Sequence, residues 1–246
     1  SNLQKEAALA IIKNVHFRGN EEILDVGCGD GKITAHIAHK VPKGHVFGID
    51  QSPNMIQSAQ NDFASVKNLS FQIADAANFS FEQKFDYVFS FSTLHWVKDL
   101  LNVLKSIKAV LERNGKVFIR MGTNEDSVIN RTFRYLCSSE QWKPYFPLGQ
   151  KSMVYYGKSA SEVEQLFAQA GFIRTRVELN IKKRIYKSGD DLVAWLMGWI
   201  PHSSGLPKGK DLEFAQATVQ HIYEHHHKKL TEPIEIACPN LQVEAL

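Results

Sequence analysis

Carboxylates and a glycine-rich turn are spaced along the first third of the chain in a way that suits a nucleoside ligand. The segment 23–31 reads ILDVGCGDG, with Asp25 just ahead of Gly27 and Gly29. Glycines allow a sharp turn between a strand and a helix, and they let a ligand approach the main chain closely. About 20 residues further on, Asp50 stands where a carboxylate can accept hydrogen bonds from both hydroxyls of a ribose.

Asp75 supplies a further carboxylate after the next apolar stretch, in the run IADA. It could accept from the exocyclic amine of an adenine, and a turn or N-cap role is the alternative. For the glycines, the alternative is a tight turn without a ligand. A dinucleotide dehydrogenase would also combine such a loop with Asp50. However, the spacing here is G-x-G-x-G, and Lys32 stands where that fingerprint requires glycine or alanine.

A second group of candidate side chains lies in the run SFSTLHW, residues 90–96. The indole of Trp96 is only a donor, so it suits an anionic acceptor. A core position packed on the following helix is the alternative. His95 could be a general base or could orient a neighbour. A carboxylic acid, with a pKa near 4, is already ionised at pH 7, so only a hydroxyl or amine substrate would need a base.

Other conspicuous residues are interpreted without a chemical role. The run His225–His227 resembles a metal-ligand cluster, but lysines follow it directly, so we interpret it as a solvated helix end and expect no metal. Cys28 lies in the glycine loop, where a small residue is mainly a steric requirement. The basic stretch 174–187 is interpreted as the solvent-exposed face of a strand, although it could steer an anionic substrate.

The elements that must position these residues alternate between strand and helix patterns. Short apolar runs predict strands, and apolar residues at helical spacing predict helices between them. This order with short connections predicts a parallel, doubly wound sheet. The predicted strands are 22–26, 45–50, 69–74, 85–90 and 116–121, and the predicted helices are 2–15, 32–40, 52–65 and 98–111.

The last part of the chain departs from this alternation. Residues 122–157 form a long connection rich in aromatic residues, which predicts a lid or substrate wall. Ser159 and Glu162 form a capping box, and the helix that they begin is expected to end at Gly171. A strand at 174–180, helices at 190–200 and 211–229, and a final strand at 241–245 complete the prediction.

Composition limits the class of protein. The chain has 246 residues, 43% apolar and 22% charged, with a net charge of +3 and three cysteines. These values exclude wholesale disorder and a disulfide framework, and they indicate a reducing compartment. No run is long enough to span a membrane, and no secretory signal is recognised, so we expect a cytoplasmic protein. We expect a single domain, 1–246, with a ligand-binding core at 16–121 and elaborations at 122–157 and 186–230.

Several runs of the sequence resemble the class I S-adenosylmethionine-dependent methyltransferases. These runs are ILDVGCGDG, GIDQSPNMI, IADA, FDYVFSFSTLHWV and NGKVFIRM, and they cover residues 22–121. The rest is similar to the trans-aconitate methyltransferases and their relatives, which include malonyl-carrier and juvenile-hormone-acid methyltransferases. The resemblance implies an α/β fold with a doubly wound, Rossmann-like, mixed sheet of seven strands, the last antiparallel.

The resemblance also implies site residues. Asp25 would orient the amino group of the methionine moiety, and Trp96 would donate to a substrate carboxylate. Gln4 could reach the active site from the first helix, although a solvated helix position is the plainer interpretation. The other positions expected around the cofactor are Gly27 and Gly29 at its tail, Asp50 at the ribose, Gln51, Met55, Asp75 and Ala76 around the adenine, and Ser90 near the sulfonium.

The expected function is an S-adenosylmethionine-dependent O-methylation of a small organic acid at its carboxylate, releasing S-adenosylhomocysteine. A different small molecule or a carrier-bound acid, such as a malonyl thioester, is the alternative substrate. A module that binds the adenosyl group without turnover is the alternative from another class. We expect a small-molecule partner and no nucleic acid, membrane or obligate protein partner, because no appended binding domain or base-flipping motif is present.

Overall fold

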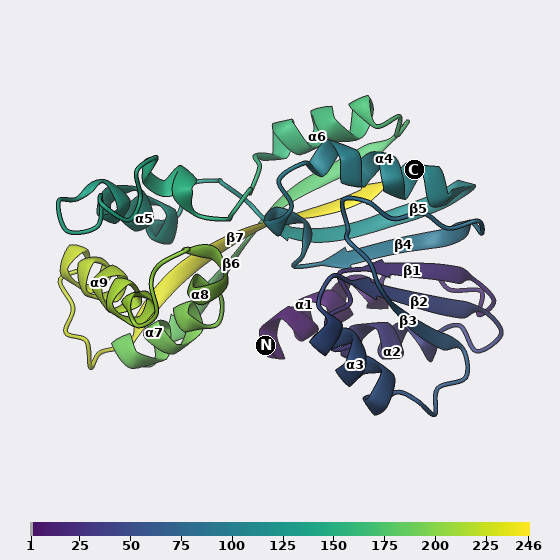
Figure 1. The fold of residues 1–246 in the computed structure, drawn as a ribbon, viewed down its shortest axis with the longest axis horizontal. Coiled ribbons are helices and arrows are strands. Elements are labelled where there is room, and N and C mark those ends of the chain that lie inside the picture. Colours follow the sequence, from purple (N-terminus) through teal and green to yellow (C-terminus); the bar gives the residue numbers. More distant parts are fainter. Residues whose placement is uncertain (1) are drawn as a thin grey trace. The chain divides into compact units, whose positions relative to one another are not determined.

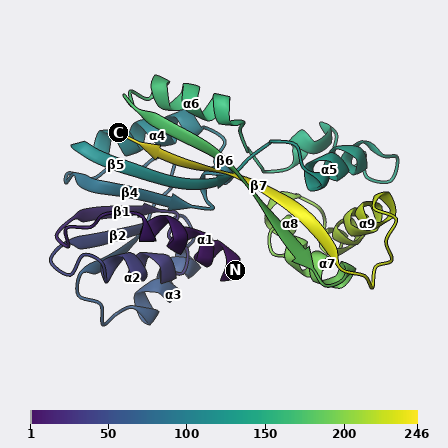
Figure 2. The same ribbon diagram turned by 180° about the vertical axis from the view of Figure 1, so that it is seen from behind.

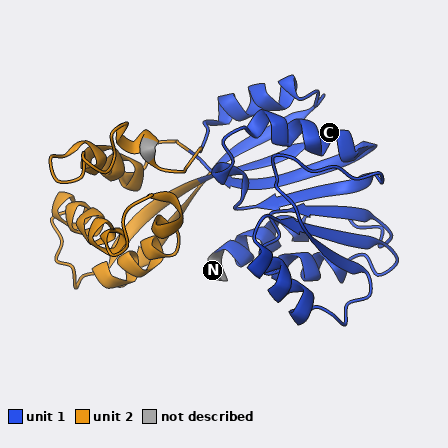
Figure 3. Ribbon diagram, in the orientation of Figure 1, with its two compact units in different colours: residues 1–123, 157–179, 240–246 blue, residues 124–156, 180–239 orange. Residues whose placement is uncertain are grey.

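The computed structural model describes residues 2–246, apart from the side chains of residues 2, 3 and 152. The chain forms two compact units, coloured separately in Figure 3. The first contains residues up to 123, residues 157–179 and residues 240–246, and the second contains residues 124–156 and 180–239. Strands β6 (Thr175–Tyr186) and β7 (Ile234–Ala245) contribute residues to both units.

A seven-stranded sheet has the strand order β3-β2-β1-β4-β5-β7-β6 (Figure 1). The first five strands pair in parallel, and β7 runs antiparallel to β5. The predicted doubly wound, mixed sheet is therefore confirmed. The chain order reverses between β1 and β4, which is where ligands bind in such sheets. The parallel strands are β1 (Glu22–Val26), β2 (His45–Asp50), β3 (Leu69–Ile73), β4 (Phe85–Phe91) and β5 (Leu111–Gly122).

Helices cover both faces of the strands in the first unit (Figure 2). On β1, Ile23 packs into the apolar cluster that contains residues of α1 and α2, whereas Leu24 packs into the cluster with α4 and α6. Both faces are buried, so the central strands read as nearly continuous apolar runs. The helices on one face are α1 (Asn2–Lys13), α2 (Lys32–Ala38) and α3 (Pro53–Asp62), and those on the other are α4 (Leu100–Val110) and α6 (Ala160–Gln169).

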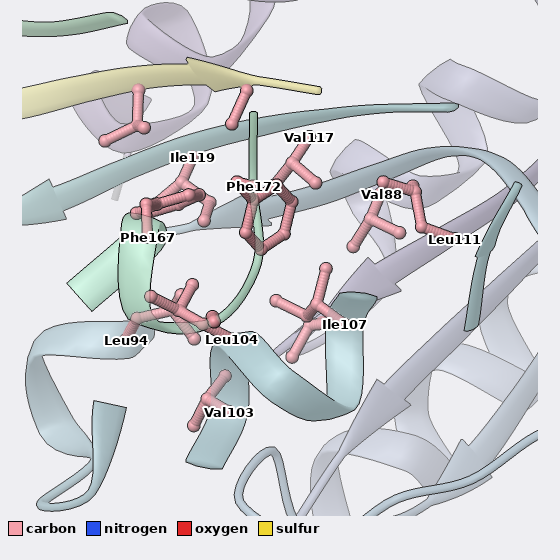
Figure 4. Packing of buried hydrophobic residues seen from close by; sticks show 14 of the residues in the cluster. Val88, Leu94, Val103, Leu104, Ile107, Leu111, Val117, Ile119, Phe167 and Phe172 are labelled. Atoms are coloured by element: carbon pink, nitrogen blue, oxygen red, sulfur yellow. The ribbon is translucent and has the colours of Figure 1, made fainter. Parts of the chain in front are cut away.

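The larger of these two clusters fixes the end of β4 (Figure 4). Leu94, in the short 3-10 helix η1 (Leu94–Trp96), is 1% exposed and anchors the segment that follows β4. Burial of one such side chain stabilises the fold by about 1.5–3 kcal/mol. The other labelled members are Val88, Val103, Leu104, Ile107, Leu111, Val117, Ile119, Phe167 and Phe172.

Two predicted helix starts, at Ser52 and at Ser159, are confirmed. The Ser52 hydroxyl accepts from the backbone N–H of Met55 at the beginning of α3, and Pro53 occupies the first helical position. At α6, Ser159 and Glu162 exchange both hydrogen bonds of the capping box.

The predicted boundary between α4 and β5 is wrong. The helix ends at Val110 and the strand begins at Leu111, rather than at residue 116 as the apolar pattern predicted. Asn114 and Gly115, a pair typical of turns, lie within the strand. Leu111 is buried and pairs with Phe85, and the register of β4 and β5 shifts just after this pair. Strand pairing has therefore absorbed the apparent turn as an irregularity of the strand.

The second unit has its own aromatic core. The expected connection at 122–157 contains a helix, α5 (Val128–Ser138), and the 3-10 helix η2 (Gly149–Ser152). Trp142 is 1% exposed, with its ring 4.9 Å from the ring of Phe214. The remaining helices are α7 (Gly189–Met197), α8 (Ile200–Ser203) and α9 (Lys210–His225). Within the described residues, no helix is long and apolar enough to cross a membrane.

Strands β6 and β7 are both longer than the sequence predicted. The expected strands covered 174–180 and 241–245, whereas both observed strands have 12 residues. The two strands are neighbours in the sheet, and Lys183 forms an ion pair with Glu235 at 2.8 Å. Pairing between distant segments thus extends strands whose local pattern is weak.

Candidate active site

The glycine loop after β1 is held against the end of β2. The backbone N–H groups of Gly27 and Cys28 donate to the carbonyl of Ile49 at 2.7 and 3.0 Å. Gly27 and Gly29 both have positive φ, at 79° and 55°. A Cβ on Gly27 would lie 2.1 Å from the Thr93 hydroxyl oxygen, whereas a Cβ on Gly29 would meet nothing within 4 Å. Gly27 is therefore required by packing, and Gly29 presents an open backbone.

Asp50 ties the glycine loop to the start of α3. One carboxylate oxygen accepts from the N–H of Gly29 at 3.0 Å, and the other accepts from the N–H of Ser52 at 2.9 Å. A carboxylate offers about four lone-pair positions, so acceptor capacity remains on both oxygens. The geometry suits a ligand with two adjacent hydroxyls.

Asp25 is a buried carboxyl group beside this loop. It is 2% exposed, and the hydroxyl of Thr34 donates to its Oδ2 at 2.8 Å. Burial, together with the nearby charge of Asp50, raises the pKa of Asp25 to about 7, although the bond from Thr34 acts in the opposite direction. A cation placed next to Asp25 would favour its ionised form.

The thiol of Cys28 offers no reactive group to the loop. Its burial and the charges of Asp25 and Asp50 raise the pKa of the thiol. A thiol must ionise to act as a nucleophile. The residue therefore serves as a small, buried side chain.

The residues predicted to surround an adenine come after the ends of β2 and β3. The backbone N–H of Ala74 donates to the Asp50 carbonyl at 3.0 Å, so the chain leaving β3 passes beside β2. Asp75 is exposed, and its Oδ1 accepts from the N–H of Ala77 at 2.9 Å, which closes a turn. Gln51 and Met55 are exposed as well, and Ala76 is partly buried.

The end of β4 is fixed by buried hydrogen bonds. The hydroxyl of Ser90 donates to the carbonyl of Val26 at 2.7 Å, which joins β4 to the beginning of the glycine loop. Two residues later, Ser92 has a φ of 59°, a left-handed conformation that is uncommon for a serine. This turn leads directly into η1 with His95 and Trp96.

His95 is held as a neutral acceptor. It is 7% exposed, and its Nδ1 accepts from the backbone N–H of Gly122 at 3.1 Å. Because an N–H can only donate, Nδ1 carries no proton and the neutral ring has its proton on Nε2. Burial and the charge of Arg120 lower the pKa of His95 to about 3. The ring lies 4.6 Å from that of Trp96, which is partly buried.

Arg120 is a residue of this edge that sequence reasoning missed. It lies near the end of β5, in register with Phe91, and its Nη1 donates to the hydroxyl of Ser92 at 3.4 Å. The signal was present as one charge inside the apolar run 117–121. Gln4 is exposed on α1, where its predicted role stays a prediction.

The histidines of α9 take part in other contacts. His221 stacks on the ring of Tyr135 at 4.5 Å, and the rings of His225 and His226 meet edge to face. Across the part of the chain that the structure describes, no three histidine, cysteine or acidic side chains are grouped to hold a metal ion.

A doubly wound sheet with a glycine loop and acidic strand ends defines a nucleotide-binding type of α/β protein. The methyltransferase domain family matches residues 17–171, and the chain belongs to this family. The resemblance inferred from the sequence motifs is thus confirmed at the level of the family.

Two relatives illustrate the range of similar sequences. The trans-aconitate 2-methyltransferase of Methylobacterium radiotolerans is 30% identical over 135 residues, which are 55% of this chain and 51% of the relative. A malonyl-[acyl-carrier protein] O-methyltransferase of Bacillus cereus is 27% identical over 163 residues, 64% of this chain and 59% of the relative. The chain spans about half the length of these curated relatives.

Solved structures share the fold. The YcgJ protein of Bacillus subtilis has a TM-score of 0.69 at 18% identity, over 98% of this chain and 97% of that one. Phosphoethanolamine N-methyltransferase 2 of Haemonchus contortus, solved with S-adenosylhomocysteine, has a TM-score of 0.61 at 21% identity, over 98% of this chain and 52% of that one.

Proposed function

We propose that this chain uses S-adenosylmethionine to methylate a carboxylate oxygen of a small organic acid. The observation that carries the choice of a carboxylate is the state of His95. Its Nδ1 is occupied by the N–H of Gly122, and its pKa is lowered to about 3, so it is a poor general base. A hydroxyl or amine acceptor must lose a proton, whereas a carboxylate is already ionised at pH 7.

The residues around the glycine loop fit this methyl donor. Asp25 is proposed to hold the cationic amino group of the methionine moiety, and such a cation would counter the effect of burial, which raises the pKa of Asp25. Asp50 has acceptor capacity for the two ribose hydroxyls, and the open backbone at Gly29 leaves room for close approach. When bound, S-adenosylmethionine supplies an electrophilic methyl group on its sulfonium.

Catalysis under this proposal consists mainly of positioning. An acceptor oxygen held about 3 Å from the methyl carbon can gain about 7–11 kcal/mol from proximity and orientation. Trp96 is proposed to donate its indole N–H to the acceptor carboxylate, and Gln4 to assist from α1.

The names of the relatives support an acid without fixing which one. One relative is named for trans-aconitate, a free tricarboxylate, and another for a malonyl group carried on a protein. Both names describe acceptors that contain a carboxylate. A free small acid is the proposed substrate, and a carrier-bound acid is the second outcome that the assay can reveal.

The experiment measures release of S-adenosylhomocysteine by the purified chain with different acceptors. The panel contains mono-, di- and tricarboxylic acids, a malonyl thioester, simple alcohols and simple amines. We expect a base-labile methyl ester from an acid. Because the acceptor is ionised and His95 is neutral, the rate at saturating S-adenosylmethionine should change little between pH 6 and pH 8. Turnover only with alcohols or amines, or no uptake of S-adenosylhomocysteine at millimolar concentration, would contradict the proposal.

A further inference from the structure

Arg120 is built into the edge of the sheet where the acceptor is proposed to lie. Its carbonyl accepts from the N–H of Ser92 at 2.8 Å, while its Nη1 donates to the hydroxyl of the same serine at 3.4 Å. Backbone and side chain of Arg120 are thus both fixed to the turn between β4 and η1. Leu94 anchors the other side of this turn in the apolar core. The guanidinium therefore has a defined place beside Ser92, and its charge acts on His95.

The positive charge next to His95 comes from Arg120 and not from the histidine itself. Arg120 is close enough to His95 to help lower its pKa, and a guanidinium stays protonated at any physiological pH. Arg120 is partly buried, where a charge interacts more strongly than it does in bulk water. A guanidinium also presents a planar set of donors that matches the two oxygens of a carboxylate.

The neutral indole of Trp96 and the cationic guanidinium of Arg120 suit different carboxylates of an acceptor. An ion pair with the reacting carboxylate would withdraw electron density from the oxygen that must attack the methyl group. The neutral indole N–H of Trp96 can orient that carboxylate at a smaller cost to its nucleophilicity. A second carboxylate, which does not react, can be bound by a full positive charge without this cost.

We propose that Arg120 binds a carboxylate of the acceptor other than the one that is methylated, so that the substrates are di- or tricarboxylates. This inference rests on the proposed function and narrows its substrate class. It also separates a free polyacid from a malonyl thioester, because the latter has one carboxylate, and that carboxylate is the one methylated.

The test compares Arg120→Met and Arg120→Lys with a matched control, Arg113→Met. Arg113 is exposed and belongs to the same strand, but it lies near the opposite end. Each variant is assayed with a series of di- and tricarboxylic acids, each paired with a monocarboxylic acid of the same chain length. Binding of S-adenosylhomocysteine by calorimetry shows whether a variant retains a folded cofactor site.

Wild type should prefer polyacids, and Arg120→Met should lower kcat/KM for the best polyacid by about 10- to 150-fold, the range for a hydrogen bond to a charged group. The loss should fall mainly on KM, with the matched monoacid and S-adenosylhomocysteine little affected. Arg120→Lys should recover part of the loss, because the charge remains without the planar fork. Arg113→Met should behave like wild type.

Different results would overturn the two proposals separately. If Arg120→Met keeps the full preference for polyacids, or if wild type methylates monoacids equally well, Arg120 does not have this role and acid methylation stands. If wild type methylates only alcohols or amines, the proposed function fails and the role of Arg120 fails with it.

Discussion

Replacement of His95 by asparagine distinguishes a neutral structural histidine from a titrating base. The Nδ1 of His95 accepts from the N–H of Gly122, and the Oδ1 of an asparagine can take over that acceptor position. A leucine could not, and it would leave the N–H of the partly buried Gly122 without this bond, at a cost of about 1–3 kcal/mol. We therefore expect His95→Asn to fold and His95→Leu to be clearly less stable.

The effect of pH on the free energy of unfolding follows from the pKa of His95 in the folded and in the unfolded chain. That pKa is about 3 in the folded chain, against an ordinary value of 6.5. Between these pH values the unfolded chain binds a proton that the folded chain does not, so the free energy of unfolding decreases as the pH falls below about 6.5. One pH unit corresponds to about 1.4 kcal/mol. Between pH 7.5 and pH 5.5, wild type should therefore lose about 1.4 kcal/mol more than His95→Asn.

The assay is urea unfolding of both proteins at these two pH values. Groups common to both proteins, including Asp25, contribute equally and cancel in the comparison. Methylation of an acid, measured in parallel, should remain within a few-fold of wild type. An identical pH dependence in the two proteins would refute the neutral, buried state of His95. A hundredfold loss of acid methylation in the folded asparagine variant would indicate that His95 acts in catalysis and would refute a purely structural role for it.

Three other predictions concern the cofactor side of the site. Asp50→Asn should weaken binding of S-adenosylhomocysteine by about 10- to 150-fold in calorimetry, because a charged acceptor for the ribose is lost; unchanged binding would remove Asp50 from the ribose site. Because the pKa of Asp25 is raised to about 7, affinity for the cationic methionine moiety should decrease as the pH falls below 7. Asp25→Asn should abolish this dependence, and a variant with the wild-type pH profile would contradict the assignment. Gly27→Ala should destabilise the fold by about 1–3 kcal/mol more than Gly29→Ala, because its Cβ would collide with Thr93. Gly29→Ala should instead reduce cofactor binding, and equal unfolding free energies for the two variants would disprove the distinction.

Much of the architecture could be predicted from local pattern. Apolar runs separated by amphipathic stretches identified the parallel strands, and Ser52 and Ser159 marked the helices that they cap. These signals are reliable because they depend on neighbours in the chain. The start of β5 was missed because its first residues become a strand only through pairing with Phe85. The lengths of β6 and β7 were missed for the same reason.

The sequence by itself determined that the acidic residues Asp25 and Asp50 would lie at the carboxyl ends of adjacent strands, with a glycine loop after the first of them. The carboxyl ends of parallel strands share one edge, so the order of elements is enough to group such residues. Only the tertiary structure decided which nitrogen of His95 carries the proton, because the deciding N–H of Gly122 is 27 residues away. It likewise placed Thr93 against Gly27 and Arg120 against Ser92. These contacts depend on which residues stand opposite one another across β1, β4 and β5, and strand register is set by packing over the whole sheet and not by any local run of residues.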